Sequence, residues 1–266
     1  MSIPGSPRSV SSEGSGSPPA LDPSTLALLD SHFAARAEEE NLFNQLAANR
    51  VSNYVAGLSD NDSDGSATGS QKLSLSVTEF QQAFGEDWQL SQFWYNPSFA
   101  ERLADLIHTL APDTAVKVAF LCCPTAFVAF QHAKHHPGAA LLEYDQRFAV
   151  LSPKQFVHYD LNEPDTFPEA LQGQVDLAIA DPPFLNEATN RKLSQTLRQI
   201  LHPTRGRLLL LTSTQVQDVL NEVYNQAPLG PLYKTKIVVE HSQLQNDFAC
   251  WGSWPEAANL GVEKQR

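Results

Sequence analysis

The sequence predicts an α/β fold in which a mostly parallel, doubly wound sheet carries helices on both faces. Two observations support this. Short apolar runs alternate with helical segments from about residue 86 onward. Three successive strand candidates also end in an acid, which places carboxylates along one edge of the predicted sheet. A helical arm is expected before this alternating part.

The first 71 residues differ in composition from the rest. Residues 1–21 are rich in Ser, Gly and Pro, so a disordered tail is expected. Residues 22–58 are the predicted N-terminal helical arm, which Asp22 caps and Pro23 opens at the first helical position. Residues 59–71 are polar and turn-rich and are expected to form a flexible insert. Residues 72–266 are assigned to one domain.

The elements of this domain follow in order along the chain. Asn96 and Pro97 open a helix that runs to Leu110. The apolar run 116–122 is typical of a strand buried on both faces, and Pro124 begins the next helix. Further strands are expected at 141–145, 155–160, 175–181 and 207–213, with helices over 186–201 and 214–225. The β-rich segments 234–241 and 246–254 have no helix between them, so an antiparallel hairpin is expected.

Charge and composition limit the possible partners. Thirty acidic residues against eighteen basic ones give a net charge of −12, which disfavours nucleic acid and suits a basic protein. No apolar run reaches the roughly 18–20 residues of a membrane span, and the first twenty residues lack the apolar core of a secretory signal. A cytoplasmic protein without a membrane contact is expected.

Cysteine and histidine spacing does not indicate a metal site. Cys122 and Cys123 are adjacent and Cys250 is far away, so free thiols are expected. His135 and His136 are expected at an exposed helix end. We therefore expect no bound metal.

Acids at neighbouring strand ends are the first candidate ligands. Ligands of doubly wound sheets bind outside the carboxyl ends of the strands, where Asp145, Asp160 and Asp181 are expected. A carboxylate after the second strand commonly binds ribose hydroxyls. Asp145 is favoured for this role, with Glu143 as the alternative. Taken singly, each acid is also compatible with a helix cap or a solvated strand end.

The turn after the first strand argues against a cofactor with phosphates. It reads Cys-Cys-Pro-Thr at 122–125, without the glycines of a nucleotide-binding turn. The helix that begins at Pro124 still offers free N–H groups to a small carboxylate. S-adenosylmethionine has a ribose, an adenine and a carboxylate but no phosphate, so it suits this turn better than NAD or ATP.

The segment DPPF at 181–184 is the strongest candidate for chemistry. Pro182 and Pro183 have no N–H and a fixed φ, so they present carbonyl acceptors on an extended chain. Beside Asp181, such acceptors can bind the hydrogens of an amine and orient its lone pair for methyl transfer. Phe184 would pack on the substrate. A simple strand-ending turn is the alternative for the tetrapeptide alone.

Several segments together resemble one family. DPPF matches the [DNS]PP[YFW] motif of amino-group methyltransferases with a seven-stranded sheet. The group that methylates a lysine of translation elongation factor 1A, once labelled N6-adenine DNA methyltransferases, is similar in WQLSQFWYNP (88–97), CPTAF (123–127), EYDQRFAV (143–150), FVHYDLNEP (156–164) and DLAIADPPFL (176–185). The resemblance covers roughly residues 22–254.

The resemblance implies a Rossmann-like seven-stranded methyltransferase sheet with an antiparallel last strand over residues 72–266. It implies S-adenosylmethionine as the consumed methyl donor and elongation factor 1A as the substrate. Separately, a monomer is expected. By position it makes Asp181, Pro182, Pro183 and Phe184 the methyl-acceptor motif. It places the cofactor near Cys123, Pro124, Thr125, Glu143, Asp145, Asp160, Phe93 and Trp94. By the same resemblance, the segment Gln92, Phe93, Trp94 and Tyr95 would close over the cofactor, with aromatic core packing as an equal alternative.

DPPF alone does not distinguish a lysine from an adenine amine. An adenine enzyme must extract its base from a helix and bind phosphates, and a chain of net charge −12 has no evident basic module for this. We therefore predict a protein-lysine N-methyltransferase, with an N6-adenine-specific DNA or RNA methyltransferase as the alternative. A binding scaffold that has lost activity is a third possibility, which the intact DPPF disfavours.

Overall fold

A computed structural model of the chain describes residues 22–59, 75–244 and 247–261. The predicted tail at 1–21 and the predicted insert at 59–71, apart from Ser59, lie outside these residues. The chain divides into two units, Met1–Glu38 and Glu39–Arg266. Helix α1 (Pro23–Ser59) begins in the first unit and ends in the second.

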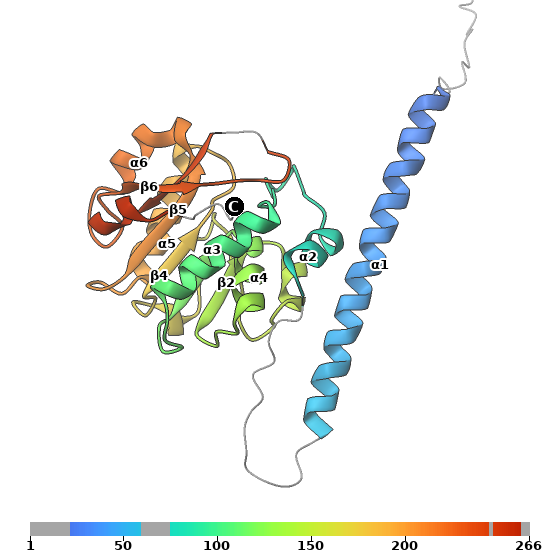
Figure 1. Cartoon of the computed structure of the whole chain (residues 1–266), viewed down its shortest axis with the longest axis horizontal. Coiled ribbons are helices and arrows are strands. Elements are labelled where there is room, and N and C mark those ends of the chain that lie inside the picture. The colour runs from blue at the N-terminus through green and yellow to red at the C-terminus, as the bar shows by residue number, and fades with distance from the viewer. Residues whose placement is uncertain (1–21, 60–74, 245–246, 262–266) are drawn as a thin grey trace, which may run out of the picture. The chain divides into compact units, whose positions relative to one another are not determined.

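The second unit contains a seven-stranded sheet with the order β3-β2-β1-β4-β5-β7-β6 (Figure 1). Strands β1 to β5 pair in parallel, whereas β7 is antiparallel to both β5 and β6. The predicted fold with its reversed last strand is confirmed. The strands are β1 (Val118–Leu121), β2 (Ala139–Glu143), β3 (Phe156–His158), β4 (Leu177–Ala180), β5 (Arg207–Ser213), β6 (Tyr233–Val238) and β7 (Phe248–Gly252).

Helices bury both faces of this sheet. The first core lies under α2 (Val77–Ala83), α3 (Pro97–Leu110) and α4 (Pro124–Ala133), and the second under α5 (Glu187–Ile200) and α6 (Gln217–Val223). Successive side chains of a strand point to opposite faces, so Phe120 belongs to the first core and Leu121 to the second. All four residues of β1 and of β4 are therefore buried, which explains why these strands read as continuous apolar runs.

Helix α2 is absent from the elements that the sequence predicted. The Ser76 hydroxyl accepts a hydrogen bond from the Glu79 N–H at 3.3 Å, and the Glu79 carboxylate accepts one from the Ser76 N–H at 2.8 Å. This reciprocal pair is a capping box, and its S-x-x-E pattern is readable in a sequence. The helix was predictable from that pattern.

His136 is buried, so the exposed position expected for it was wrong. Its exposed fraction is 2%, its N–H donates to Gln131 Oε1 at 2.9 Å, and its Nε2 lies 3.1 Å from the Asp113 carbonyl oxygen. Burial lowers the pKa of His136 below its usual value, which favours the neutral ring. A neutral imidazole ring can occupy a position in the core. The expectation had treated His136 as a polar residue that stays at the surface.

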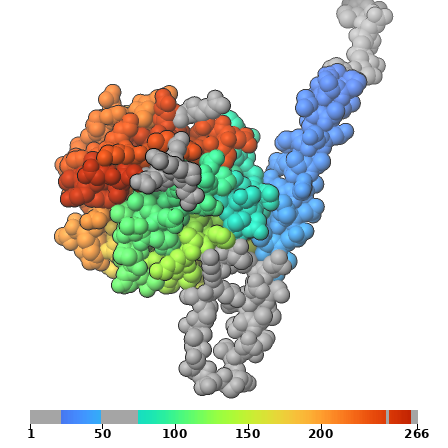
Figure 2. Space-filling model, in the orientation of Figure 1, coloured from blue at the N-terminus to red at the C-terminus, as the bar shows by residue number. Residues whose placement is uncertain are grey.

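The segment after β6 packs against the start of α3. The Asn96 N–H donates to the Glu240 carbonyl oxygen at 2.8 Å, and Arg102 Nη2 lies 3.1 Å from Glu240 Oε1. The green surface around α3 and the red surface of the C-terminal strands adjoin in the space-filling view (Figure 2). These two segments meet beside the carboxyl edge of the sheet.

Strand order reverses between β1 and β4. Strand β1 pairs with β2 on one side and with β4 on the other, so the chain leaves β1 and β4 at adjacent points of the same edge. Doubly wound sheets bind their ligands at this position.

Among the helices of the described residues, none combines the length and the apolar character that crossing a bilayer requires.

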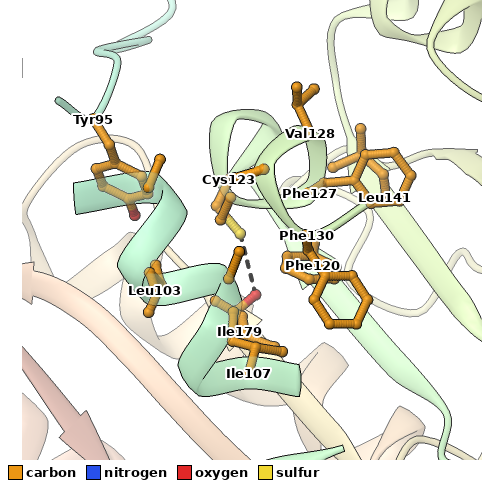
Figure 3. Close-up of a cluster of buried hydrophobic side chains, with 14 of the residues drawn as sticks. Tyr95, Leu103, Ile107, Phe120, Cys123, Phe127, Val128, Phe130, Leu141 and Ile179 are labelled. Carbon is orange, nitrogen blue, oxygen red and sulfur yellow. Dashed lines mark hydrogen bonds between the residues drawn. The ribbon is translucent and has the colours of Figure 1, made fainter. Parts of the chain in front are cut away.

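The aromatic cluster beside β1 provides a test of the first core (Figure 3). The fully buried Phe120 ring lies 5.7 Å from Phe127 and 5.2 Å from Phe130, measured between ring centroids. We expect Phe120→Ala to lower the free energy of unfolding by about 3–5 kcal/mol, because it removes buried surface and leaves a cavity. Val238→Ala, at a residue that is 60% exposed on β6, is the control, with an expected change below about 0.5 kcal/mol. Urea unfolding measures both, and a loss below about 1 kcal/mol for Phe120→Ala would contradict the packing.

Candidate active site

A cavity of about 500 Å³ lies at the carboxyl edge of the sheet, a size in the range of small-molecule sites. The segments after β1, β2, β3 and β4, residues 88–95 before α3, and side chains between β6 and β7 form its walls. Every predicted site residue except Asp145 lines it. These residues are Phe93, Trp94, Cys123, Pro124, Thr125, Glu143, Asp160, Asp181, Pro182, Pro183 and Phe184.

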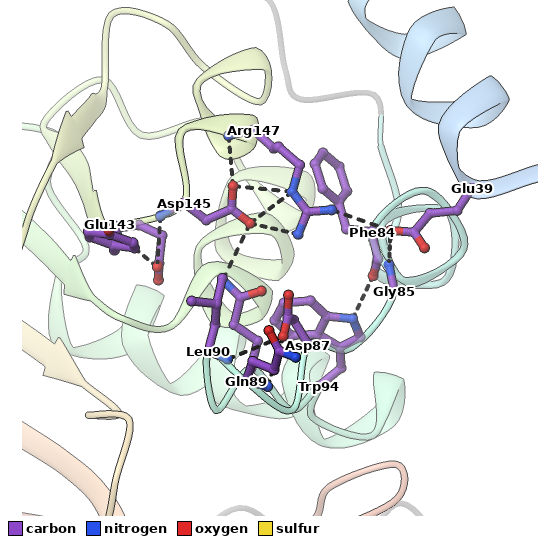
Figure 4. A network of polar contacts seen from close by, with 12 residues as sticks. Glu39, Phe84, Gly85, Asp87, Gln89, Leu90, Trp94, Glu143, Asp145 and Arg147 are labelled. Carbon is purple, nitrogen blue, oxygen red and sulfur yellow. Dashed lines mark hydrogen bonds and ion pairs between the residues drawn. The ribbon is translucent and has the colours of Figure 1, made fainter. Parts of the chain in front are cut away.

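Asp145 binds Arg147 instead of facing the cavity (Figure 4). Arg147 Nε and Nη2 donate to Asp145 Oδ2 at 2.9 and 2.7 Å, and the Arg147 N–H donates to Oδ1 at 3.0 Å. Arg147 Nη1 also lies 3.4 Å from Glu39 Oε1. The Asp145 carboxylate is therefore already neutralised by a neighbour two residues away.

Glu143 is the last residue of β2, and it lines the cavity. It is 6% exposed, and its Oε1 accepts a hydrogen bond from the Tyr144 N–H at 2.9 Å. Burial raises the pKa of Glu143 to about 7, because the charged carboxylate loses contact with water. Of the two candidate ribose ligands, Glu143 lines the cavity and Asp145 does not.

Asp181 follows β4 directly and accepts a hydrogen bond from a buried hydroxyl. The Tyr95 Oη donates to Asp181 Oδ2 at 2.5 Å. Burial raises the pKa of Asp181 to about 7, and the hydrogen bond from Tyr95 opposes this rise. Burial, followed by the charge of Asp181, holds the pKa of Tyr95 well above its usual value, so the phenol keeps its proton. Asp181 therefore changes charge close to neutral pH.

The DPPF segment makes a sharp corner after β4. Pro182 is buried, whereas 51% of the Phe184 side chain is exposed while still lining the cavity. Phe184 has a φ of +55°, and its carbonyl oxygen accepts a hydrogen bond from the Asn186 N–H at 2.8 Å. The corner thus holds an aromatic ring at the mouth of the cavity.

Left-handed backbone is concentrated at this cavity. In the described part of the chain, the non-glycine residues with positive φ are Ser91, Cys122 and Phe184, at +54°, +57° and +55°. All three line the cavity. Such conformations cost about 1–3 kcal/mol each and persist where the surrounding structure holds them, typically at functional sites.

The cavity is acidic. Glu143, Asp160 and Asp181 line it, and no lysine or arginine does so among the residues that the structure describes. His241 also lines it, but burial lowers the pKa of His241 to about 4, so its ring is neutral at physiological pH. The cavity therefore favours a positively charged ligand over a phosphate.

Aromatic side chains surround the cavity mouth. Trp88 and Tyr144 line the cavity and are 65% and 53% exposed, and Phe93 meets Trp88 edge to face at 4.8 Å between ring centroids. Trp94 differs, since it is 3% exposed and its Nε1 donates to the Phe84 carbonyl oxygen at 2.6 Å. The Trp94 ring is therefore packed in the core, which was the alternative for this segment. Phe93 faces the cavity.

Several cavity residues were missed by sequence reasoning. Tyr95 was expected only within the segment that closes over the cofactor, and its bond to Asp181 was not foreseen because this partner is 86 residues away. Tyr144 and Tyr159 each adjoin a strand-end acid, which could have drawn attention to them. His241 and Phe248 come from the hairpin, whose distance from the motifs hid them. The aromatic and histidine side chains that line the cavity without a predicted role are Trp88, Tyr144, Tyr159, His241 and Phe248.

The family model described as "Probable N6-adenine methyltransferase" matches residues 86–256, a range that contains every residue lining the cavity. This chain belongs to that family. Two relatives of this chain carry a different description. "Protein-lysine N-methyltransferase EFM5" of Saccharomyces cerevisiae is 33% identical over 192 residues, covering 66% of this chain and 75% of the yeast protein. "EEF1A lysine methyltransferase 1" of Mus musculus is 33% identical over 192 residues, covering 70% of this chain and 80% of the mouse protein.

A solved structure shares the fold of the family. The branched-chain polyamine synthase C9 mutein from Thermus thermophilus, in complex with N4-aminopropylspermidine and 5′-methylthioadenosine, superimposes with a TM-score of 0.53. The match covers 71% of this chain and 66% of the synthase at 13% identity. At this identity the similarity concerns the fold alone.

The buried carboxyl of Asp181 predicts a pH-dependent gain in stability on its removal. Its pKa of about 7 lies above the value near 4 of an unfolded chain, so ionisation destabilises the fold as pH rises through this interval. We expect Asp181→Asn to raise the free energy of unfolding by about 1–4 kcal/mol at about pH 8. The gain should shrink by about half or more at about pH 5, where the folded protein keeps this proton.

Urea unfolding at both pH values measures this effect. Asp176→Asn is the matched control, since Asp176 is also an acid beside β4 but lies outside the cavity lining. It binds Arg205 and the Lys117 N–H, so its replacement should destabilise the protein. An equal gain for Asp181→Asn at the two pH values would contradict a raised pKa at this carboxyl.

Proposed function

We propose that this protein is an S-adenosylmethionine-dependent protein-lysine N-methyltransferase whose substrate is translation elongation factor 1A. The observation that carries the choice of lysine is the charge of the cavity. Three carboxylates line it, and none of the described lysine or arginine residues does so. Such a cavity attracts an ammonium group and repels a phosphate chain. The relatives named for EEF1A support the choice of protein substrate.

The polar groups of the cavity suit S-adenosylmethionine. Thr125 Oγ1 and Gln92 Oε1 line it and are buried without a hydrogen-bond partner among the described residues, although buried polar atoms normally have one. Helix α4 begins there at Pro124, and Cys123 gives it no side-chain cap. The first N–H groups of α4 are therefore available to a ligand carboxylate.

We assign the parts of the cofactor to these groups. Glu143 binds the ribose hydroxyls, the start of α4 with Thr125 binds the amino-acid end, and Asp160 lies near the adenine. The ion pair of Asp145 with Arg147 supports Glu143 over Asp145, because the Asp145 carboxylate is already bound. The carboxylates also balance the positive charge of the sulfonium.

When bound, S-adenosylmethionine supplies an electrophilic methyl carbon on positively charged sulfur, and the bonding pair returns to sulfur as nitrogen takes the methyl group. The protein has to bind the minority neutral form of lysine. A free lysine side chain has a pKa of about 10.4, so roughly one lysine in a thousand is neutral at physiological pH. The carbonyl groups of Pro182 and Pro183 and the carboxylate of Asp181 accept the hydrogens of this amine and orient its lone pair, while the ammonium proton passes to water.

The aromatic mouth complements this chemistry. The stem of a lysine is apolar, so Phe93 and Phe184 can cover it while the amine reaches Asp181.

An N6-adenine methyltransferase is the second candidate, and the description of the family model favours it. An exposed Phe184 would then stack on the base. The acidic cavity and the net charge of −12 oppose this second candidate.

The ribose assignment is tested by cofactor affinity. We expect Glu143→Gln to raise the dissociation constant of S-adenosylmethionine about ten- to hundredfold, since it removes charged hydrogen-bond acceptors. Asp145→Asn should change it by less than about threefold. Isothermal titration of both variants measures the difference. A larger loss for Asp145→Asn would return the ribose role to Asp145.

The substrate is tested by label transfer. We expect purified protein with methyl-labelled S-adenosylmethionine to label elongation factor 1A, but neither adenine-containing DNA nor RNA. Asp181→Asn should lower this transfer at least about a hundredfold, while cofactor affinity stays within about threefold, because the residue orients the amine and not the cofactor. Label on nucleic acid alone would establish the adenine candidate. Cofactor binding without any transfer would favour a scaffold.

A further inference from the structure

Tyr95 is held rigidly beside the cavity. Its exposed fraction is 1%, and its carbonyl oxygen accepts a hydrogen bond from Gln81 Nε2 of α2 at 2.7 Å. Its ring lies 5.3 Å from Phe99 of α3 and 5.2 Å from His241, measured between centroids, and its backbone forms a β-bridge to His241. Three separate segments therefore determine where the phenol oxygen lies.

That oxygen is directed at one atom of the methyl-acceptor motif. Tyr95 Oη donates to Asp181 Oδ2 at 2.5 Å, and this is the one hydrogen bond that the described residues give to the Asp181 carboxylate. A bond to a single oxygen restricts the rotation of the carboxylate and leaves Oδ1 as an acceptor for a ligand. Asp181 alone has two side-chain torsions and would not be restricted to this orientation.

We propose that Tyr95 is a positioning residue for methyl transfer: its hydroxyl holds Oδ2 of Asp181, so that Oδ1 accepts a hydrogen from the substrate amine. This inference rests on the proposed function, because it assigns Tyr95 to the same site. Tyr95 touches Asp181 and acts through it.

The surroundings of Asp181 give this hydrogen bond a second effect. Burial raises the pKa of Asp181, and the bond from Tyr95 lowers it. No described cation lines this cavity, so the phenol is the group that favours the ionised acceptor there. The titratable groups that interact with Asp181 are Tyr95 before α3, Cys122 and Cys123 after β1, and Cys250 of β7. Glu143, Asp160 and His241 line the same cavity.

The sign of the expected change follows from this arrangement. Without the phenol, the pKa of Asp181 rises further above its usual value, so more of the carboxyl is protonated at neutral pH. A protonated carboxyl presents a hydroxyl donor and one fewer free acceptor to the amine. Removal of the phenol should therefore be most harmful at neutral and acidic pH and be partly relieved at alkaline pH.

Tyr95→Phe tests the inference with two readouts. In the full chain, we expect the Asp181 carboxyl resonance, assigned by its loss in Asp181→Asn, to titrate about one pH unit higher by carbon-13 NMR. We expect the acidic limb of kcat/KM for elongation factor 1A methylation to move by the same amount, with about a fivefold loss at pH 7. Unmoved values for both readouts would overturn the inference.

Tyr224→Phe is the matched control. Tyr224 is also 1% exposed and its hydroxyl donates to Asn190 Oδ1 at 3.1 Å, but it lies outside the cavity lining. The control should lose stability without moving the Asp181 titration or the pH profile. An equal shift in the control would show that lost packing, and not the phenol, moves the titration, which also overturns the inference.

A second substitution covers the case in which Tyr95→Phe does not fold. Replacement of Tyr95 by 3-fluorotyrosine keeps the ring and strengthens the donor, so the Asp181 titration should move to lower pH. A shift in the opposite direction, or none, would overturn the inference. The NMR readout needs no turnover, so it separates the two proposals. A shifted titration without methylation of elongation factor 1A refutes the proposed substrate and retains the phenol–carboxyl coupling. Methylation with an unmoved titration refutes the role of Tyr95.

Discussion

The burial of carboxyl groups at the carboxyl edge of the sheet is the constraint on which the rest of the site depends. Glu143 and Asp181 line one cavity, and burial raises the pKa of each to about 7. Each shift corresponds to a few kcal/mol of lost stability when the group ionises, at roughly 1.4 kcal/mol per pKa unit. A fold can keep such groups when the remainder is rigid, and the two fully buried cores on either side of the sheet provide this rigidity.

The same edge also holds backbone in unfavourable conformations. Cys122 follows β1 and Phe184 follows β4, and both have positive φ where these neighbouring strands end. The parallel pairing of β1 with β4 holds the two turns side by side, so a glycine-free first turn can still line a binding cavity. Strain, burial of charge and the proposed cofactor contacts are thus concentrated at the point where strand order reverses.

Much of the fold was predictable from sequence because its signals are local. The apolar runs of β1 and β4 and the caps of α3 indicate buried strands and a helix without reference to distant residues. The remaining features of the site depend on which of several possible partners a side chain contacts in the folded protein. Sequence reasoning favoured Asp145 over Glu143, and only the structure shows that the Asp145 carboxylate is paired with Arg147. The bond between Tyr95 and Asp181 joins segments 86 residues apart, which a pattern in one chain does not reveal.

Arg147 also ties a turn of the sheet to the N-terminal helix. It binds Asp145 after β2 and lies 3.4 Å from Glu39, whose carboxylate accepts a hydrogen bond from the Gly85 N–H at 2.9 Å. Phe43 of the same helix packs edge to face on Phe84. The second half of α1 therefore belongs to the folded body, although composition assigns it to an arm. A recombinant fragment that begins at residue 72 would expose Phe84 to solvent and remove Glu39 as a counter-ion of Arg147. A truncation that keeps these contacts has to start upstream of Glu39.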